Sequence, residues 1–229
     1  MFTGLIQCVG TVASRSLLGG SVRFTVTAPE IASLLKVGDS IACEGACLTA
    51  ETVNATGFSV CAVAETLAKT TLSDWQPGKR INLETSLTPS TPMGGHFVLG
   101  HVDGLARVES FVAVPGGGKT LTVRLPDAFA KYCVYKGSIT LAGVSLTIAS
   151  VENASVSVAL IPHTLVNTTL GELRPGSNLH FEADILAKYT ERLLARDQKT
   201  SSLTTAGLSQ WGYTGSQSIG ESHNGSAAS

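Results

Sequence analysis

The chain has 229 residues, enough for two domains of roughly 90 to 100 residues that each bury a core of their own. Its formal net charge is −1, its pI is about 6.5 and it has no run of Lys or Arg, so we expect a small-molecule substrate, with neither a nucleic acid nor an anionic membrane as partner. No apolar stretch approaches the ~18 residues of a membrane span, and the first residues lack the basic and apolar blocks of a secretory signal, so we expect neither.

Short β-strands are the main predicted element. Alternating or clustered β-branched residues mark strands at 21–28, 57–64, 119–126 and 155–162, and turn-prone stretches such as LLGGS and VNATG separate them. The fragment GGGKT at 116–120 imitates a phosphate-binding loop, but strand-like sequence flanks it on both sides, so we interpret it as a hairpin turn. Short strands at even spacing are typical of barrels and sandwiches.

Helical signals are few. Segments 65–78 and 163–176 each contain a Thr that can cap one helical turn before a Pro-Gly turn. One longer helix is predicted after Asp184 as N-cap, and its apolar stripe from Ile185 to Leu193 is suited to a partner surface. From about residue 199 onward Ser, Gly and Thr predominate, and we expect a disordered tail.

Residues 38–86 and 136–184 are similar to each other along their whole length. Aligned at a constant offset of 98 without a gap, they share 16 identities in 49 positions, where unrelated sequences would share about three. A solenoid stacks three or more shorter repeats, whereas this unit has nearly a hundred residues and occurs only twice. We therefore infer two similar domains that offer two similar pockets.

Small reactive side chains recur at equivalent places in the two repeats. Cys47 and Thr49 follow a glycine in the first repeat, and Ser145 and Thr147 follow one in the second. Strand alternation places both members of each pair on one face, and the glycine lets another group approach the backbone beside them. Small residues that only pack in a crowded barrel interior would give the same pattern, so both interpretations stay open on the residues alone.

Histidines and cysteines complete the candidate chemistry. His96 and His101 lie in the Gly-rich segment MGGHFVLGHVDG, where proton transfer competes with structural hydrogen bonding as their role. Cys43 and Cys47 lack a second Cys pair or a near His, so we do not expect a metal site. Five cysteines at uneven spacing indicate reduced thiols and a cytoplasmic location rather than a disulfide framework.

Six motifs follow one another along the chain: MFTG, GDSIACEGACLT, MGGHFVLGHVDG, YKGSITLAGVSLT, IPHTLVNTTLG and AKYTERLL. Together they resemble the riboflavin synthase family of the α-subunit type, which is built from two lumazine-binding repeats. The resemblance extends from Met1 to about Arg196. It implies an all-β fold of two similar six-stranded antiparallel Greek-key barrels, then a trimerisation helix and the tail, at 1–97, 98–184, 185–198 and 199–229.

The resemblance also implies a reaction. Two molecules of 6,7-dimethyl-8-ribityllumazine exchange a four-carbon unit and give riboflavin and 5-amino-6-ribitylamino-uracil, without a metal or an organic cofactor. Two identical substrates held in opposite orientation call for two homologous pockets, which gives the duplication a purpose. The implied partners are two further copies in a homotrimer, with each site between the N-terminal barrel of one subunit and the C-terminal barrel of the next, and an association with lumazine synthase.

Site residues follow from the resemblance as well. His101 is the expected proton-transfer residue at the acidic 7-methyl group, and Ser145 and Cys47 are expected to interact with, or add to, the electrophilic ring carbon. The implied substrate-binding residues, taken from both barrels and the first motif, are Phe2, Thr3, Ser40, Thr49, Thr66, His96, Lys136, Thr147, Ile161, Thr164 and Asp184.

Three positions depart from the family pattern. Glu44 stands where the first repeat usually has Asn, Ala142 where the second usually has Asp, and His180 where the usual residue is an Asn like Asn82. Because the usual Asp is absent at position 142, any mechanism that relies on an acid beside Ser145 is in doubt. A second hypothesis for the function therefore stays open. Relatives with the same barrels bind lumazine or flavin as light-emitting antennae without catalysis. The retained candidate catalytic residues favour the enzyme, because a pure binder needs no proton-transfer group.

Overall fold

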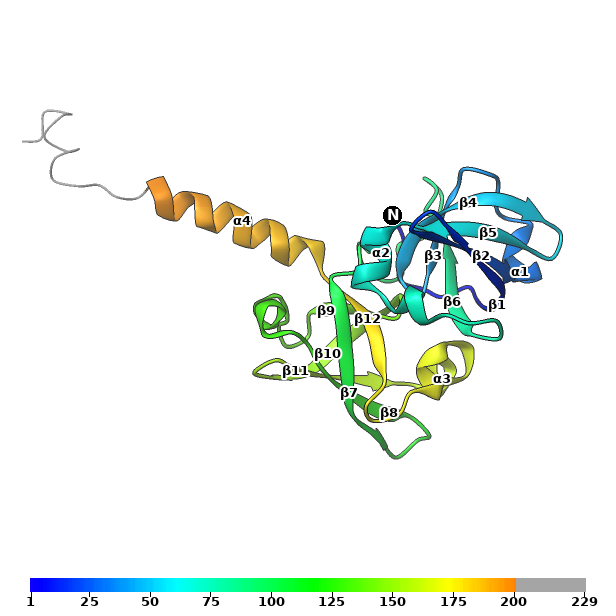
Figure 1. The fold of residues 1–229 in the computed structure, drawn as a ribbon. Coiled ribbons are helices and arrows are strands. Elements are labelled where there is room, and N and C mark those ends of the chain that lie inside the picture. The colour runs from blue at the N-terminus through cyan, green and yellow to red at the C-terminus, as the bar shows by residue number, and fades with distance from the viewer. Residues whose placement is uncertain (201–229) are drawn as a thin grey trace, which may run out of the picture. The chain divides into compact units, whose positions relative to one another are not determined.

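The structure is a computed structural model that describes residues 1–200 of the chain. Within this part, twelve strands form two closed antiparallel barrels of six strands each, as predicted (Figure 1). Residues 1–188, which contain both barrels, form one compact unit, and the remainder of the last helix belongs to a second. No helix in the described part of the chain has the length and hydropathy that a membrane span requires.

The first barrel begins a few residues after the N-terminus. Its strands are β1 (Cys8–Leu18), β2 (Ser21–Thr27), β3 (Ser40–Cys43), β4 (Ala46–Asn54), β5 (Gly57–Ala62) and β6 (Arg80–Thr85). They neighbour one another around the barrel in the order β1, β2, β5, β4, β3, β6. Its helical segments are α1 (Pro29–Ala32), α2 (Ala64–Lys69) and the 3-10 helix η1 (Thr71–Asp74).

The second barrel has the same connectivity. Its strands are β7 (Gly104–Ala113), β8 (Lys119–Arg124), β9 (Ser138–Leu141), β10 (Val144–Glu152), β11 (Ser155–Leu160) and β12 (Asn178–Ala183). Its helical segments are α3 (Pro162–Asn167) and the 3-10 helices η2 (Asp127–Tyr132) and η3 (Thr169–Glu172). When β7 is matched to β1 and so on, the strand order around the two barrels is identical.

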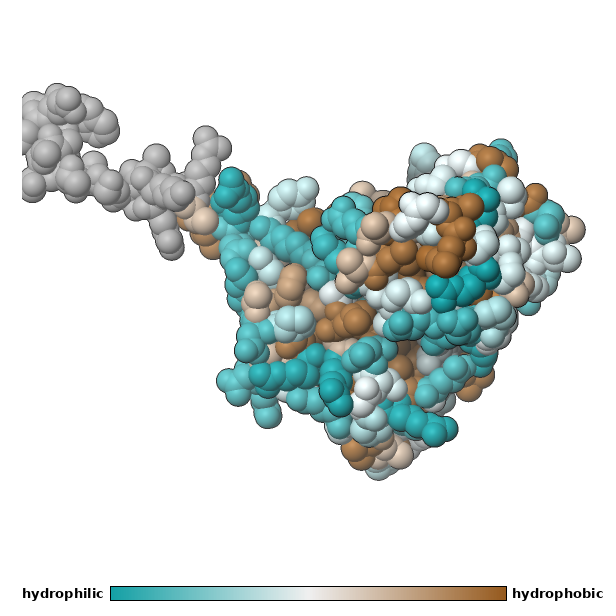
Figure 2. All heavy atoms as spheres, in the orientation of Figure 1, coloured by the Kyte–Doolittle hydropathy of each residue, from teal (hydrophilic) through white to brown (hydrophobic). Residues whose placement is uncertain are grey.

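Alternating burial along the strands fills each barrel with apolar side chains. In β2, Val22, Phe24 and Val26 are buried and the residues between them are exposed. Burying such a side chain contributes about 1.5–3 kcal/mol, so the interior positions are committed to packing. The alternate positions, including those of β4 and β10, remain on the outer surface. On the face that Figure 2 shows, apolar residues form separate patches among polar ones.

The duplication extends further back than the ungapped repeat suggests. Val26 of β2 lies opposite Phe58, and Val123 of β8 lies opposite Val156, so these strands match at an offset of 97 rather than 98. Val12 and Val108 precede equivalent bulges in β1 and β7 and match at an offset of 96. Two single-residue length differences therefore hide the first third of the repeat from an ungapped alignment.

Several local predictions are confirmed. Thr70 and Thr168 each accept a hydrogen bond of 3.3 Å from the backbone N–H two residues further on, which caps η1 and η3. The backbone N–H of Val114 donates to the carbonyl oxygen of Gly118 at 3.0 Å, so the segment containing GGGKT is the predicted hairpin turn between β7 and β8.

The last helix, α4 (Ile185–Thr200), begins where predicted. Asp184 accepts a hydrogen bond of 2.9 Å from the backbone N–H two residues further on, as an N-cap does. The helix ends two residues beyond the predicted 185–198. Beyond residue 200, the predicted tail at 199–229 lies outside the described residues.

Candidate functional site

A cleft of about 230 Å³ lies on the outside of the first barrel. It brings together three predicted site residues: Cys47 from β4, Thr66 from α2, and His101 from the segment that leads into the second barrel. The other lining residues are Ala46, Glu65, Lys69, Thr70, Gly100 and Val102. A half-buried thiol, a hydroxyl and an exposed imidazole thus face one small space.

Two other predicted residues of the first barrel lie further along the same sheet. Thr49 of β4 is exposed and lines a separate, open depression of about 650 Å³. Ser40 of β3 lies opposite Thr49 in the strand pairing and lines neither space. The structure therefore groups Cys47, Thr66 and His101 more closely with one another than with Ser40 and Thr49.

The second barrel repeats the outward-facing pair. Ser145 and Thr147 alternate with buried or partly buried residues on β10, and Thr164 is half-buried on α3. Ile161, just before α3, is 61% exposed. Lys136 is exposed, and its Nζ lies 5.0 Å from the centre of the Tyr135 ring.

His96 is bonded directly to Ser145. Its Nδ1 lies 2.7 Å from Ser145 Oγ, and its Nε2 lies 3.2 Å from the hydroxyl of the buried Thr140. Burial lowers the pKa of His96, which Asp184 opposes, so the neutral imidazole is favoured. When Nε2–H donates to Thr140, Nδ1 can accept the Ser145 proton. We expected His96 only as a substrate-binding residue, because nothing in its spacing revealed this contact.

The segment before each barrel crosses to the other barrel. Phe2 and Val98 pair as a two-residue antiparallel bridge, with N–H to oxygen distances of 2.7 and 3.1 Å. Beyond the bridge, the Gly4 carbonyl accepts the N–H of Ser145, and the Gly100 carbonyl accepts the N–H of Cys47, each at 2.8 Å. Phe2 is fully buried and packs with Ala42, Val98 and Cys47. The backbones of Ser145 and Cys47 are thus each held by the segment that precedes the opposite barrel.

Only glycine fits at the two crossing points. Gly4 has φ +75° and Gly100 has φ +77°, in the left-handed region that disfavours side chains. A Cβ on Gly4 would lie 2.6 Å from the Cβ of Ser145, and one on Gly100 would lie 2.6 Å from the Cβ of Cys47. The two backbones therefore approach the reactive residues as closely as atoms allow.

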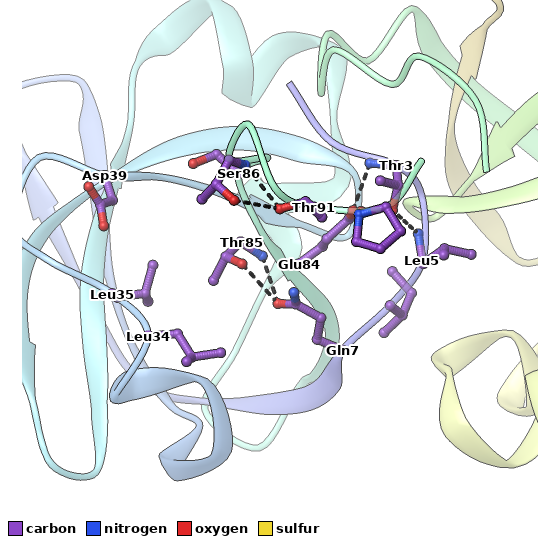
Figure 3. Close-up of a pocket in the computed structure, with 13 residues that line it drawn as sticks. Thr3, Leu5, Gln7, Leu34, Leu35, Asp39, Glu84, Thr85, Ser86 and Thr91 are labelled. Carbon is purple, nitrogen blue, oxygen red and sulfur yellow. Dashed lines mark hydrogen bonds between the residues drawn. The ribbon is translucent and has the colours of Figure 1, made fainter. Parts of the chain in front are cut away.

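Two buried glutamates, which the sequence reasoning missed, anchor these segments. Glu84 of β6 accepts hydrogen bonds from the N–H and the hydroxyl of Thr3 (Figure 3). It also accepts one from the N–H of Gly4. Glu182 of β12 accepts from the N–H groups of Leu99 and Gly100. Burial raises the pKa of both carboxyls, while these hydrogen bonds favour the charged form. Both repeats carry Glu at this position, and this identity is the feature of the sequence that could have revealed the two residues.

Thr3 is consequently a buried anchor, with 3% of its surface exposed. Its side chain lies beside Glu84 at one wall of a further cleft of about 600 Å³, which Leu34, Leu35 and the residues after β6 also line (Figure 3). Phe2 and Thr3 are the two implied substrate-binding residues of the first motif. Phe2 packs against Cys47, and Thr3 is held by Glu84 of β6.

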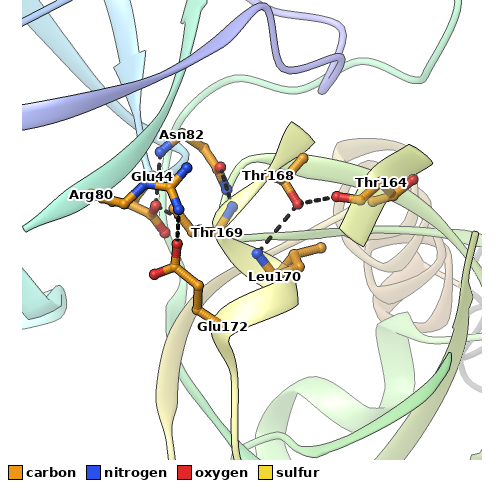
Figure 4. Close-up of polar contacts among 8 residues, drawn as sticks. All are labelled: Glu44, Arg80, Asn82, Thr164, Thr168, Thr169, Leu170 and Glu172. Atoms are coloured by element: carbon orange, nitrogen blue, oxygen red, sulfur yellow. Dashed lines mark hydrogen bonds and ion pairs between the residues drawn. The ribbon is translucent and has the colours of Figure 1, made fainter. Parts of the chain in front are cut away.

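The three departures from the family pattern gather between the barrels. Glu44 Oε1 accepts hydrogen bonds from the N–H of Asn82 and the hydroxyl of Thr169 (Figure 4). The side-chain amide of Asn82 donates to the carbonyl of Ala142. His180 holds the equivalent place to Asn82, with Nδ1 2.8 Å from the Glu44 carbonyl oxygen. These residues hold the two barrels together. Ala142 takes part in this contact through its backbone carbonyl, which any residue at this position would supply.

The electrostatics of this contact are set by burial. Burial raises the pKa of Glu44 to about 7 and lowers that of His180 to about 4. The Nε2 of His180 accepts the N–H of Thr71 at 2.8 Å, so this nitrogen carries no proton in the structure and Nδ1–H donates to Glu44. The ring therefore fits its site only in the neutral form. Across the described residues, no three His, Cys, Asp or Glu side chains gather so that they could hold a metal ion.

Comparison with known proteins gives consistent results. The family described as lumazine binding domain matches residues 3–86 and 99–184. Riboflavin synthase from Bacillus subtilis (strain 168) is 37% identical over 216 residues, which cover 93% of this chain and 100% of the relative. Riboflavin synthase from Brucella abortus (strain 2308) is 40% identical over 198 residues, covering 84% and 98%. That from Photobacterium phosphoreum is 36% identical over 199 residues, covering 86% and 91%.

Solved structures share the fold. The crystal structure of LumP complexed with 6,7-dimethyl-8-(1'-D-ribityl) lumazine has a TM-score of 0.72, and that of LumP complexed with riboflavin has 0.74. Both are 21% identical to this chain and cover 80% of it and 99% of their own length. At this identity the likeness concerns the arrangement of the two barrels.

Proposed function

The chain belongs to the riboflavin synthase family, and we propose that each of its two barrels holds one of the two substrate molecules of the family's reaction. The reaction transfers a four-carbon unit from one 6,7-dimethyl-8-ribityllumazine to another and gives riboflavin and 5-amino-6-ribitylamino-uracil. The chain is accordingly a transferase. The observation that carries the two-site proposal is the repeated arrangement in which a crossing glycine carbonyl holds Cys47 in one barrel and Ser145 in the other.

In the first site, we assign the lumazine ring to the cleft of Cys47, Thr66 and His101. The hydroxyl of Thr66 can bond the polar ring edge. His101, exposed on the rim, can receive a proton from the 7-methyl group, as the family resemblance implied. Proton transfer by a placed group contributes typically 10²- to 10⁴-fold to a rate, and holding two rings in register contributes further.

In the second site, we assign the proton of the Ser145 hydroxyl to His96. As the Ser145 oxygen approaches the electrophilic ring carbon of a lumazine, its proton passes to Nδ1 of His96, which is 2.7 Å away and neutral. Thr140 fixes the opposite ring nitrogen. The two sites thereby differ, with a thiol in one and a serine–histidine pair in the other. Unequal roles for the two lumazines are consistent with one giving and one receiving the four-carbon unit.

We further propose the homotrimer, with each complete site formed between neighbouring subunits, a cytoplasmic location and an association with lumazine synthase. The support for the trimer is the exposed apolar stripe of α4. Leu186, Tyr189, Leu193 and Leu194 are each between 55% and 65% exposed, which is a high fraction for side chains of this kind.

The deciding experiment supplies purified chain with the lumazine alone, in the presence of chelator. We expect riboflavin and the pyrimidine product in a one-to-one ratio. The alternative function is that of a non-catalytic lumazine- or flavin-binding protein, which the shared fold with LumP favours. Tight binding of the lumazine without formation of riboflavin would establish that alternative instead.

A further inference from the structure

We propose that Glu84 and Glu182 act as crossed positioning residues, in which the carboxylate of each barrel orients the reactive side chain of the other barrel. Glu84 belongs to the first barrel and serves Ser145 of the second. Glu182 belongs to the second barrel and serves Cys47 of the first. The inference rests on the two lumazine sites proposed above.

The first half of this crossed arrangement connects Glu84 to Ser145. The residue is 4% exposed, and its carboxylate accepts three hydrogen bonds, from the Thr3 N–H at 2.7 Å, the Thr3 hydroxyl at 2.6 Å and the Gly4 N–H at 2.9 Å. Gly4 donates its N–H to Glu84, and its own carbonyl oxygen accepts the N–H of Ser145. A single residue therefore links the carboxylate to the backbone of Ser145.

The second half repeats this geometry from Glu182. The residue is 3% exposed, and its carboxylate accepts the N–H of Leu99 at 2.8 Å and the N–H of Gly100 at 2.9 Å. The Gly100 carbonyl then accepts the N–H of Cys47. Only the hydroxyl donor is missing, because the position that matches Thr3 is Leu99. We expect the first half to be the more tightly fixed of the two.

The close packing at the crossing glycines transmits any displacement. Since a Cβ on either glycine would lie 2.6 Å from the Cβ of its target, the segment cannot shift by a few tenths of an ångström without moving Ser145 or Cys47. Gly95 adds a second contact in the first half, because a Cβ there would lie 2.0 Å from the Thr3 carbonyl oxygen and 3.0 Å from the Cβ of Ser145. His96, bonded to Ser145, follows it directly.

A carboxylate is specifically suited to this place. Its two oxygens accept from two successive N–H groups, whereas the amide of a glutamine offers one acceptor oxygen and turns an NH₂ group towards the second donor. Glu84→Gln and Glu182→Gln therefore keep the side-chain size and break one of the two anchoring bonds. Leu83 and Phe181, which precede them in the strands, stay in the barrel cores.

The test measures each site separately by thiol alkylation. In a Ser145→Cys chain, the thiols at positions 47 and 145 report on the two sites, and mass spectrometry of the peptides gives the labelling rate of each. Glu182→Gln should change the rate at position 47 by about threefold or more and leave position 145 unchanged. Glu84→Gln should do the reverse. Cys43 is fully buried and serves as the internal control of folding.

An uncrossed pattern, in which each substitution changes the label in its own barrel, would overturn the proposal, and so would rates that do not change at all. If Cys43 becomes reactive in Glu84→Gln, the milder Thr3→Val decides, because it removes the hydroxyl that donates to Glu84 and accepts the N–H of Leu5 but keeps both backbone donors to Glu84. It should alter position 145 alone, and a change at position 47 or at neither would contradict the crossing. The labelling requires no lumazine, so it can succeed even if the chain forms no riboflavin.

Activity supplies the second readout. In chains that keep Ser145, Glu84→Gln and Glu182→Gln should each lower kcat for riboflavin formation by about 10- to 100-fold, since small misplacements of reacting groups cost rates of that order. Glu84→Asp and Glu182→Asp keep both acceptor oxygens and should restore part of the rate. Equal losses in the Gln and Asp variants would indicate a purely structural role.

Discussion

The contact between the barrels should make stability respond to pH in two opposite ways. His180 has an ordinary pKa of 6.5 that burial lowers to about 4, so between these values the unfolded chain binds a proton that the folded chain does not. This contribution is complete above pH 6.5 and is lost as the pH falls towards 4. Glu44 has an ordinary pKa of 4.5 that burial raises to about 7. Its carboxyl favours the folded state below pH 4.5 and loses that advantage as the pH rises through 7.

Each residue changes the free energy of unfolding by about 3 kcal/mol across the pH range between its ordinary and its shifted pKa, at about 1.4 kcal/mol per pH unit. From pH 4.5 to 6.5 the two slopes are opposite and nearly equal, so they cancel in the parent chain. His180→Asn should remove one slope and keep the fold, because Asn82 already makes both equivalent bonds, to Ala142 and Thr169. Glu44→Gln should remove the other slope.

Urea unfolding at pH 4.5, 5.5, 6.5 and 7.5, at one protein concentration, measures the difference from the parent. The stability of His180→Asn relative to the parent should rise by about 3 kcal/mol as the pH falls from 7.5 to 4.5. That of Glu44→Gln should rise by a similar amount as the pH increases over the same range. Differences that do not change with pH would show that neither group titrates in the folded contact, and the reasoning from burial would be wrong.

Three further predictions concern the sites. Gly4→Ala should lower the rate of riboflavin formation at least about tenfold, whereas Gly78→Ala, with a similar positive φ but nothing within 4 Å, should leave it unchanged; equal losses would point to backbone strain alone. His96→Gln should lower kcat by about 10²-fold and abolish the pH dependence due to the imidazole, and an unchanged pH–rate profile would remove it from proton transfer. A chain with Cys47→Ala and one with Ser145→Ala should each be nearly inactive but regain activity when co-expressed, and verified heterotrimers that stay inactive would place the whole site within one chain.

Much of the fold could be predicted from local pattern. The alternation in segments such as 21–28 and 155–162 gave β2 and β11, and Asp184 gave the start of α4. The ungapped repeat predicted two similar domains. It could not include β1 and β2, or β7 and β8, because one-residue differences in length shift the register to offsets of 97 and then 96.

The site was less accessible to sequence reasoning, because its contacts join residues far apart in the chain. Phe2 pairs with Val98, and Gly4 supports Ser145, across distances that no periodicity reports. The pair of His96 and Ser145 arises in the same way. The glutamates at 84 and 182 were detectable in principle, as identical acids at buried strand positions.

The central claim is that each barrel holds one substrate molecule, and the most direct measurement is the binding stoichiometry of riboflavin. Equilibrium dialysis should give two riboflavin molecules per chain. Cys47→Trp, which fills the cleft of the first barrel, should reduce the number to one, as should Ser145→Trp in the second barrel. One molecule per parent chain, or two in either Trp variant, would contradict the account.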